Sequence, residues 1–429
     1  MSKIFVETHG CSANLAESEM MMGILQKEDH AVVHSPRDAD IIIHNACTVK
    51  GEDTSLFSIR KIKERFPDKK LIVSGCLTSN LIDTSRVLLP DVSFVNTHNV
   101  HRIGDVVDEV NNGNAVEIIS RDARVKLGLP RIRKNSIVGI VPILNSCNNH
   151  CTFCSVWQVK GKLFSYPQEE IIHEVSESIK QGCKEIWLTS QDNGAYFIDK
   201  GGSPRYPSLL ASICTLPGEF HVRFGMINPQ HILPVIDEFI DVMKNEKMFK
   251  FLHIPVQSGS NTVLQRMDRG YTVEDFISII EKIRKEIPDI TFATDIICGF
   301  PGETEEQAAQ TENLLDNLQF DVINISRFFP RKNTKAARMV DQLHGRDKKR
   351  RSRKITELYL STSLNKNKKW IGWKGKILVD EQGKNGTLVG RNYAYKPVII
   401  NGPYSLGDLV NVEIINASSF DLKGKIISH

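Results

Sequence analysis

The order of apolar and polar positions predicts three successive domains. Up to about residue 112, apolar runs alternate with helical patterns, and from about 133 to 365 six longer strand-like runs again alternate with helices. From 366 to 429 only short alternating runs remain, separated by glycines and Asn-Gly pairs. Strands that alternate with helices are typical of parallel sheets, whereas short runs between turns are typical of a small β-barrel. We therefore expect an α/β chain with residues 113–132 as a linker and a last domain that is a five-stranded barrel.

The strand-like runs of the first domain each end in a cysteine. They read KIFVETHGC, DIIIHNAC and KLIVSGC, and they end at Cys11, Cys47 and Cys76. Ligand sites of parallel α/β sheets lie at the carboxyl ends of the strands. The fold is therefore expected to bring these three thiols together as a cluster site. The alternative is that they are small residues buried near strand ends, since free cysteine is often buried.

Helical patterns separate these runs, from Leu15 to Lys27 and from Ser55 to Phe66. Asn14 is expected at the turn where the first helix begins, with a side chain able to bond a ligand. Glu17 and Glu19 are interpreted as charges in the first turn of that helix, where they complement its dipole.

A second set of three cysteines begins the central segment. Cys147, Cys151 and Cys154 follow the apolar run 137–144 in the spacing CxxxCxxC. Three thiolates on one short loop can hold three corners of a cubane iron–sulfur cluster and leave one iron open for a small molecule. A structural zinc site remains an alternative, with His150 as the local fourth ligand. A disulfide does not suit three cysteines in a chain without signs of secretion.

Six apolar runs of the central segment read as strands, and helical patterns such as 168–181, 272–286 and 305–317 separate them. Six such units suit a partial TIM-like (β/α)6 barrel, whose active site uses the carboxyl ends of the strands. The strands are expected at Val138–Leu144, Glu185–Thr189, His221–Met226, Phe251–Pro255, Thr291–Ile297 and Val322–Phe328.

Polar side chains close or follow several of these runs. Gln191 with Asp192, Gln257 with Ser258, and Asp295 stand where side chains can contact a bound cofactor. Ser258 also suits a turn before a helix. A structural hydrogen bond is the alternative for Asp295.

Composition and charge narrow the class of protein to which the chain can belong. The chain has 429 residues, 41% hydrophobic and 25% charged, as is ordinary for a globular protein of two to four domains. Its net charge of +4 is uneven: eleven Lys/Arg face two Asp/Glu in 331–354, and ten face five from 366 onward. With Glu357 between them, the last 99 residues carry +13 and the first 330 carry −9. This asymmetry is typical of binding to a polyanion such as RNA, whereas a solvated charged helix is the plainer interpretation of 346–354 alone.

The absence of long apolar runs and of a signal sequence argues against a membrane or secreted protein. No run of 18 or more apolar residues predicts a membrane span, and the N-terminus does not read as a signal peptide. Nine cysteines without a secretory signal predict a reducing compartment, the cytoplasm. Cys183, Cys214 and Cys298 match no ligand motif and are interpreted as packing residues.

In the last domain, short runs read as strands and aromatic residues surround a basic one. Arg391, Tyr393 and Tyr395 could stack on bases and meet phosphates, and the alternative is that the aromatic residues are core, as is expected for Trp370. The runs are 376–379, 387–390, 398–400, 409–415 and 423–427. This domain resembles a TRAM domain, an RNA-binding module of tRNA-modifying enzymes.

Across the chain, the motifs resemble those of the methylthiotransferase family of radical S-adenosylmethionine (SAM) enzymes. The motifs are GCSAN, NACTV and SGCL before CxxxCxxC, followed by EIWLTSQDNGAY, HIPVQSGS, VLQRMDRGYT and DIICGFPGET. The resemblance covers nearly the whole chain and is closest to the branch shared by archaea and eukaryotes.

The resemblance implies two 4Fe-4S clusters and SAM as cofactors. Cys147, Cys151 and Cys154 would hold the radical cluster, whose open iron chelates SAM, and Cys11, Cys47 and Cys76 the auxiliary cluster, which handles sulfur. Phe153 would lie against the adenine of SAM, with ordinary packing as the alternative. Gln191, Gln257, Ser258 and Asp295 are the other expected SAM contacts.

The resemblance also implies the reaction and the partners. The branch converts N6-threonylcarbamoyladenosine, next to the anticodon at tRNA position 37, to its 2-methylthio form. An external electron donor and a sulfur source are expected, and no membrane partner. The alternatives are the branch acting on N6-isopentenyladenosine in tRNA and the branch acting on an aspartate of a ribosomal protein. The positive charge of the last 99 residues favours RNA over a protein substrate.

Overall fold

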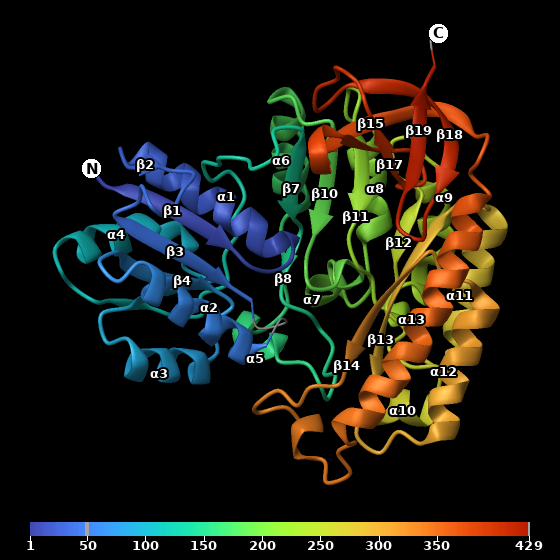
Figure 1. Ribbon diagram of the computed structural model, residues 1–429, viewed down its shortest axis with the longest axis horizontal. Helices are drawn as coiled ribbons and strands as arrows, with labels where there is room; N and C mark the ends of the chain where they lie inside the picture. The colour runs from blue at the N-terminus through green and yellow to red at the C-terminus, as the bar shows by residue number, and fades with distance from the viewer. Residues whose placement is uncertain (48–50, 428–429) are drawn as a thin grey trace.

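A computed structural model describes residues 1–47 and 51–427, and confirms an α/β fold in three parts. Thr48 and Val49 of the NACTV motif lie outside the described residues. In Figure 1 the N-terminal sheet lies on the left, the central half-barrel on the right, and a small β-barrel sits at the top.

The N-terminal part is a six-stranded parallel sheet with helices on both faces. The strand order is β2-β1-β3-β4-β5-β6, so that β1, β3 and β4 are direct neighbours. Strand β6 (Glu117–Ile118) lies within the segment predicted as a linker, yet it pairs with β5. The domain limits at 112, 132 and 365 stay predictions. The other elements are β1 (Lys3–Thr8), α1 (Ser12–Lys27), β2 (Ala31–Val32), β3 (Ile41–Ala46), α2 (Glu52–Arg65), β4 (Lys70–Gly75), α3 (Ser79–Leu88), β5 (Ser93–Asn96) and α4 (Ile103–Asn111).

Both faces of this sheet are apolar, because side chains alternate along each strand. Ile43 and Ile72 pack with α1 and α4 on one face. Ile42 and Val73 pack with the helices of the other face. The continuous apolar runs read from the sequence therefore reflect strands that are buried on both sides.

The central part is an open barrel of parallel strands in chain order. Strands β7 (Val138–Pro142), β10 (Glu185–Thr189) and β11 (His221–Phe224) form one sheet, and β12 (Phe251–His253), β13 (Thr291–Cys298) and β14 (Val322–Arg327) form the next. Backbone hydrogen bonds such as Phe249 N to Val222 O, at 3.0 Å, join the two sheets. All six predicted strands are present.

Helices cover the outside of this half-barrel, and a short hairpin follows β7. No described helix is both long and apolar enough to cross a bilayer. The longest described helix, α13 (Gly345–Lys368), runs beside β14 toward the C-terminal barrel (Figure 1). The remaining elements are β8 (Leu144–Asn145), α5 (Val156–Lys160), β9 (Phe164–Ser165), α6 (Gln168–Lys180), α7 (Ile198–Gly201), α8 (Tyr206–Cys214), α9 (Ile236–Met243), α10 (Asn261–Arg266), α11 (Val273–Glu286) and α12 (Glu305–Leu318).

The C-terminal part is a closed five-stranded barrel, as predicted. Its strand order is β15-β16-β17-β19-β18, and its interior is filled by aliphatic side chains such as Ile377, Val398 and Val412. Closure leaves no unpaired edge. The strands are β15 (Lys374–Gln382), β16 (Leu388–Arg391), β17 (Pro397–Ile400), β18 (Leu409–Ala417) and β19 (Leu422–Ile426).

The C-terminal barrel docks on the amino ends of the central strands. Tyr395 packs its ring against Phe249 and Phe251, and its hydroxyl donates to Glu185, the first residue of β10, at 2.8 Å. Arg391 lies over the Tyr395 ring and bonds Asp380 at 2.9 Å. Both side chains are therefore engaged within the protein, as the core alternative foresaw, and their contact with bases stays a prediction.

Tyr393 remains half exposed beside Trp370 and Trp373, and its hydroxyl donates to Asp289 at 2.9 Å. Its contact with RNA stays a prediction. Trp370 packs against the barrel core, as expected.

A buried ion pair joins the three elements at this interface. Asp321, just before β14, bonds Lys366 of α13 at 2.6 Å and Lys396 of the C-terminal barrel at 2.7 Å. Although burial opposes ionisation, the two ammonium groups hold the pKa of Asp321 below its usual value. The two pairs therefore fix the position of the barrel through charges of which Asp321 and Lys396 are buried and Lys366 is partly exposed.

We expect Lys396→Met to destabilise this docking by about 2–3 kcal/mol, the low end for breaking a buried pair because Lys366 remains. Urea unfolding followed by tryptophan fluorescence measures the change. The matched control is Lys423→Met on exposed β19, which should stay within about 0.5 kcal/mol of the original protein. Equal stability of the two variants would contradict the assigned role of the pair.

Candidate functional site

The first set of cysteines lies at the carboxyl ends of three adjacent strands. Cys11 follows β1, Cys47 follows β3 and Cys76 follows β4, and these strands pair in parallel register. Cys47 and Cys76 are buried, whereas Cys11 is exposed. The parallel sheet thus brings together thiols that are far apart in the sequence, as predicted.

Asn14, in the first turn of α1, is the centre of this set. Its side-chain oxygen lies 3.4 Å from Cys11 Sγ and 4.0 Å from Cys76 Sγ. Its side-chain nitrogen donates to Ala46 O at 2.8 Å and to Asn45 Oδ1 at 3.0 Å. Asn45 in turn donates to Asn14 O at 2.8 Å. The fully buried side-chain amide of Asn14 therefore contacts all three segments that carry the cysteines.

Sterics explain why glycine precedes both Cys11 and Cys76. Gly10 has φ of +139°, and a Cβ there would come within 2.9 Å of Asn14 and Cys47 side chains. Gly75 has φ of +95°, and a Cβ there would meet Asn45 Oδ1 at 2.2 Å. Only glycine permits this backbone conformation and this close approach.

The second set lies on the loop after β8, and each of its sulfurs accepts a hydrogen bond. Asn149 Nδ2 donates to Cys147 Sγ at 3.3 Å, Arg269 Nη1 to Cys151 Sγ at 3.0 Å, and the backbone N of Val156 to Cys154 Sγ at 3.4 Å. Donors directed at sulfur stabilise a thiolate or a metal-bound sulfur rather than a neutral thiol.

Residues of the central barrel hold this loop in place. Ser146 adopts a left-handed conformation, with φ of +75°, and its backbone N donates to Gln191 Oε1 at 2.8 Å. Asp192 accepts from Asn149 at 2.9 Å and from the backbone N of Asn228 at 3.1 Å. Gln191 and Asp192, predicted as cofactor contacts, therefore also position the cysteine loop.

The chemistry of both sets fits metal-bound thiolates. Burial raises the pKa of Cys76 to about 12 and also raises the pKa values of Cys147 and Cys154. Such groups ionise at neutral pH only where a strong positive charge, such as iron, binds them. The N–H donors and the basic side chains around them suit the anionic form.

A mononuclear zinc site does not fit the cysteines. A zinc ion bonds sulfur at about 2.3 Å, so its ligand sulfurs lie about 4 Å apart. Within residues 1–47 and 51–427, the only trio of potential ligands with all donor atoms inside 4.8 Å is Glu7, His9 and His44. His150 is exposed on the loop. Neither cysteine set forms such a compact trio in the described part of the chain, whereas a cubane spreads its ligands over irons at separate corners.

The other predicted cofactor contacts lie along the open side of the barrel. Asp295 is partly exposed and accepts from His253 at 2.7 Å and from Asn324 at 2.8 Å. Gln257, with φ of +73°, forms a parallel bridge with Ile296 of β13. Ser258 is buried, and its hydroxyl lies against the hydroxyl of Thr311. The turn role foreseen for Ser258 and the structural bond foreseen for Asp295 are both present.

Phe153 is partly buried beside Phe300 and Phe328 and lines a cavity of about 440 Å³. One wall of this cavity is the start of α2 from the N-terminal domain, and the other is formed by the carboxyl ends of β13 and β14. Arg327 and Arg331 line it together with Asp53. The cavity therefore joins the two domains next to the cysteine loop.

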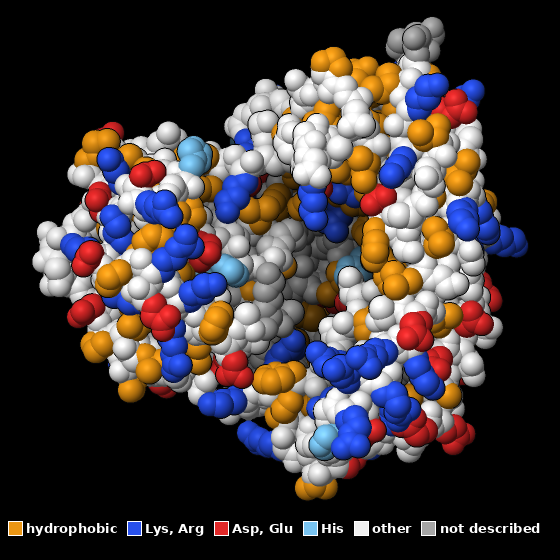
Figure 2. Space-filling model, viewed as in Figure 1, with side chains coloured by type: hydrophobic (Ala, Val, Ile, Leu, Met, Phe, Trp, Pro, Cys, Tyr) orange, Lys and Arg blue, Asp and Glu red, His pale blue; other side chains and the backbone are white. Residues whose placement is uncertain are grey.

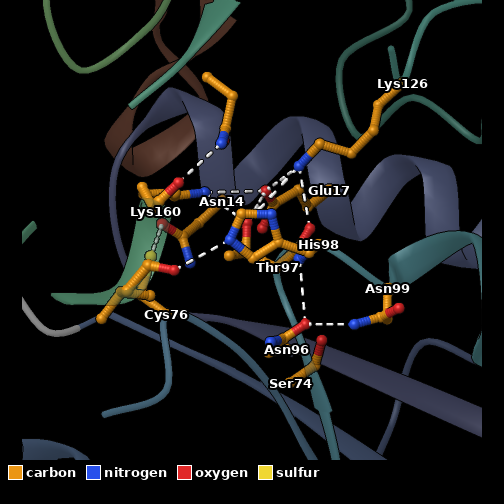
Figure 3. A network of polar contacts seen from close by, with 12 residues as sticks. Asn14, Glu17, Ser74, Cys76, Asn96, Thr97, His98, Asn99, Lys126 and Lys160 are labelled. Atoms are coloured by element: carbon orange, nitrogen blue, oxygen red, sulfur yellow. Dashed lines mark hydrogen bonds and ion pairs between the residues drawn. The ribbon is translucent and has the colours of Figure 1, made fainter. Parts of the chain in front are cut away.

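A buried charged network lies between the two cysteine sets. Glu17 of α1 bonds Lys126 at 2.7 Å and Lys160, the last residue of α5, at 3.0 Å. Thr97 donates to the same carboxylate, and the backbone of Thr97 accepts from Lys126 at 3.0 Å. Figure 3 shows Glu17 and Thr97 between Lys126 on one side and Lys160 with Cys76 on the other.

The interpretation of Glu17 and Glu19 as helix-dipole charges is wrong. Both lie beyond the first turn and are buried, Glu17 with two lysines and Glu19 against the backbone N of Lys134. Burial opposes the charge of Glu17, but the lysines lower its pKa to about 2. Sequence reasoning also passed over Arg269, Lys126 and Lys160, because partners far apart along the chain leave no local pattern.

Cys183, Cys214 and Cys298 are buried in the main apolar core, which confirms them as packing residues.

Comparison with known families agrees with this division of the chain. Residues 141–315 match the radical SAM superfamily, residues 3–96 match the uncharacterized protein family UPF0004, and residues 371–427 match the TRAM domain. Among solved structures, the radical SAM methyltransferase TsrM from Kitasatospora setae is similar with a TM-score of 0.56 and 14% identity, over 78% of this chain and 76% of that one. That likeness shows the fold alone.

The fold and the cysteine loop define a radical SAM protein with an added three-cysteine site and a C-terminal TRAM barrel. Related sequences then identify the family within this class. A protein of Pyrococcus abyssi named a probable threonylcarbamoyladenosine tRNA methylthiotransferase is 39% identical over the full length of both chains. The human threonylcarbamoyladenosine tRNA methylthiotransferase is 34% identical over 100% of this chain and 74% of its own. The chain belongs to the threonylcarbamoyladenosine tRNA methylthiotransferase family.

We expect Asn14→Ala to weaken the first cysteine set. The substitution leaves the buried Ala46 O and Asn45 side chain without a donor, which costs about 1–3 kcal/mol. The variant should retain about half of the iron that the original protein binds after anaerobic reconstitution, since only one set is affected. Asn112→Ala on the exposed end of α4 is the control and should retain all of it. Full iron content in Asn14→Ala would rule out this role.

Proposed function

We propose that this enzyme adds a methylthio group to C2 of N6-threonylcarbamoyladenosine at position 37 of tRNA. The observation that carries the proposal is the presence of two cysteine sets, one across the ends of β1, β3 and β4 and one after β8, on a loop whose Phe153 lines an interdomain cavity. The full-length likeness to methylthiotransferases supports it. The chemistry needs one site that activates SAM and another that handles sulfur, close to the same base.

The six cysteines are proposed to hold two 4Fe-4S clusters, with Cys147, Cys151 and Cys154 for the radical cluster and the sheet-end set for the auxiliary one. When bound, the radical cluster supplies the electron that splits SAM. Three protein ligands per cluster leave one iron vacant in each, for SAM at the first and for sulfur at the second.

The chain's own residues orient the cofactor and shield it from water. Arg269 and Asn149 donate to the sulfurs of Cys151 and Cys147, which would hold the radical cluster. Phe153, Gln191, Gln257, Ser258 and Asp295 are proposed to contact SAM. The partly exposed carboxylate of Asp295, whose pKa is lowered by His253 and Asn324 against the effect of burial, remains ionised to accept hydrogen bonds. The hydroxyl of Ser258 is engaged, so its backbone is the available group.

Charge supports an RNA substrate. Figure 2 shows a hollow between the N-terminal domain and the barrel, with Lys and Arg side chains gathered below it. Arg346, Lys349 and Arg353 of α13 are exposed, whereas Arg350 and Arg351 pair with Glu305 of α12. Part of the predicted basic segment therefore anchors α13, and the rest faces solvent, where it suits phosphates.

The cavity favours the threonylcarbamoyl group over an isopentenyl group. The threonyl part carries a carboxylate, and Arg327 and Arg331 line the cavity beside Phe153. An isopentenyl chain is apolar and offers no negative group to these side chains. Modification of a ribosomal-protein aspartate does not account for the basic surface and the TRAM barrel.

The electron and the sulfur are proposed to come from outside the chain. The three cysteines that belong to neither set are buried in the core, so they do not suit a further exchange site within the described residues. All nine cysteines lack a disulfide, which suits work in the reducing cytoplasm, where tRNA is modified.

We expect Cys151→Ala to abolish formation of 5′-deoxyadenosine, because SAM loses its radical cluster. Cys47→Ala should keep that activity and lose methylthio transfer, because only the auxiliary site is removed. Both products are measured by chromatography with dithionite as reductant. The assignment fails if Cys151→Ala still forms 5′-deoxyadenosine, or if Cys47→Ala gives normal amounts of methylthiolated tRNA.

Deletion of the gene is expected to remove 2-methylthio-N6-threonylcarbamoyladenosine from total tRNA and leave its unmethylthiolated precursor. Nucleoside mass spectrometry identifies the substrate directly. Loss of the isopentenyl form instead, or of a modified ribosomal aspartate in a peptide digest, would assign the enzyme to one of the other two branches.

A further inference from the structure

The buried network around Glu17 contains more positive than negative charge. Lys126 and Lys160 share the single carboxylate of Glu17, and all three side chains are at most 7% exposed. Thr97, which bonds both Glu17 and Lys160, is neutral. A buried charge without a partner is costly, so the remaining positive charge is expected to face a negative group nearby.

The sheet-end cysteines provide that negative group. Burial lowers the pKa of Lys160, but Cys76, Glu17 and Cys11 raise it above its usual value. The pKa of Lys126 is lowered by burial, and Cys76 has only a minor effect on it. Figure 3 shows the same arrangement, with Lys160 on the side of Cys76 and Lys126 on the far side of Glu17.

The position of Lys160 along the chain links the two cysteine sets. It ends α5, a helix that begins two residues after Cys154. Asn145, at the start of the same loop, donates to Lys160 O at 3.0 Å. The helix that follows the last cysteine of one set therefore carries a charge toward the other set. Glu17 of α1 keeps the ammonium group in place.

Three thiolates on an oxidised 4Fe-4S core leave a net negative charge, and reduction adds to it. In a buried site, a fixed positive charge favours the more negative state. We propose that Lys160 is a positioning residue of the auxiliary site, whose buried ammonium group compensates the charge of the cluster and raises its reduction potential. This inference rests on the proposed assignment of Cys11, Cys47 and Cys76 as cluster ligands.

The test uses the full chain with Cys147, Cys151 and Cys154 replaced by Ala, so that only the auxiliary cluster contributes. Reconstituted protein is titrated with dithionite, and the reduced cluster is followed by electron paramagnetic resonance. Lys160→Met should shift the midpoint potential to a more negative value, and Lys160→Arg should return it close to that of the parent. Lys126→Met, which removes a charge on the other side of Glu17, should cause a smaller shift.

Each outcome is decisive. An unchanged potential in Lys160→Met, or an equal shift in Lys126→Met, overturns the proposal. If Lys160→Met binds no iron while Lys160→Arg does, the charge is required for the cluster itself, and the proposal stands. If neither variant binds iron, shape rather than charge is required, and the proposal fails. A parent without iron would refute the assignment of the cysteine ligands instead.

Discussion

The parallel pairing of β1, β3 and β4 is the interaction on which the site depends. Because all three strands run in one direction, their carboxyl ends meet at one edge, and each end carries a cysteine. Asn14 then joins the segments through one buried amide, and glycines before Cys11 and Cys76 permit the turns. A slip of one residue in any of these pairings would move its cysteine to the other face of the sheet.

The contact between the first two domains combines an apolar part, where Ala16 and Met20 of α1 pack against Val138 and Ile140, with a buried charged part. Glu17, Lys126 and Lys160 come from a helix of the first domain, from the connecting segment and from the cysteine loop. Apolar side chains would fill the same space with less desolvation cost. The buried charges instead link α1, the connecting segment and α5 through one shared carboxylate.

The two ends of the central barrel have different tasks. The TRAM barrel covers the amino ends of the strands, where Tyr395 and Lys396 are used for docking. The carboxyl ends stay open toward the first domain, with Phe153 and Asp295 near the opening. Stability is thus concentrated at one end, and chemistry at the other, as in other barrels built from parallel strands.

The sequence by itself determined the fold class, the strands that end in cysteines and the CxxxCxxC loop, because these depend on local periodicity and on short spacings. The five strands of the last domain followed from the same signals, with bounds that differ by a few residues. Only the tertiary structure decided what Glu17, Arg269, Lys160 and Tyr395 do. Their partners lie 118 residues away for Arg269 and 143 for Glu17 with Lys160, so no local pattern marks them. A charged or aromatic side chain looks the same in a sequence whether it faces water, RNA or a buried sulfur, and packing alone decides between these environments.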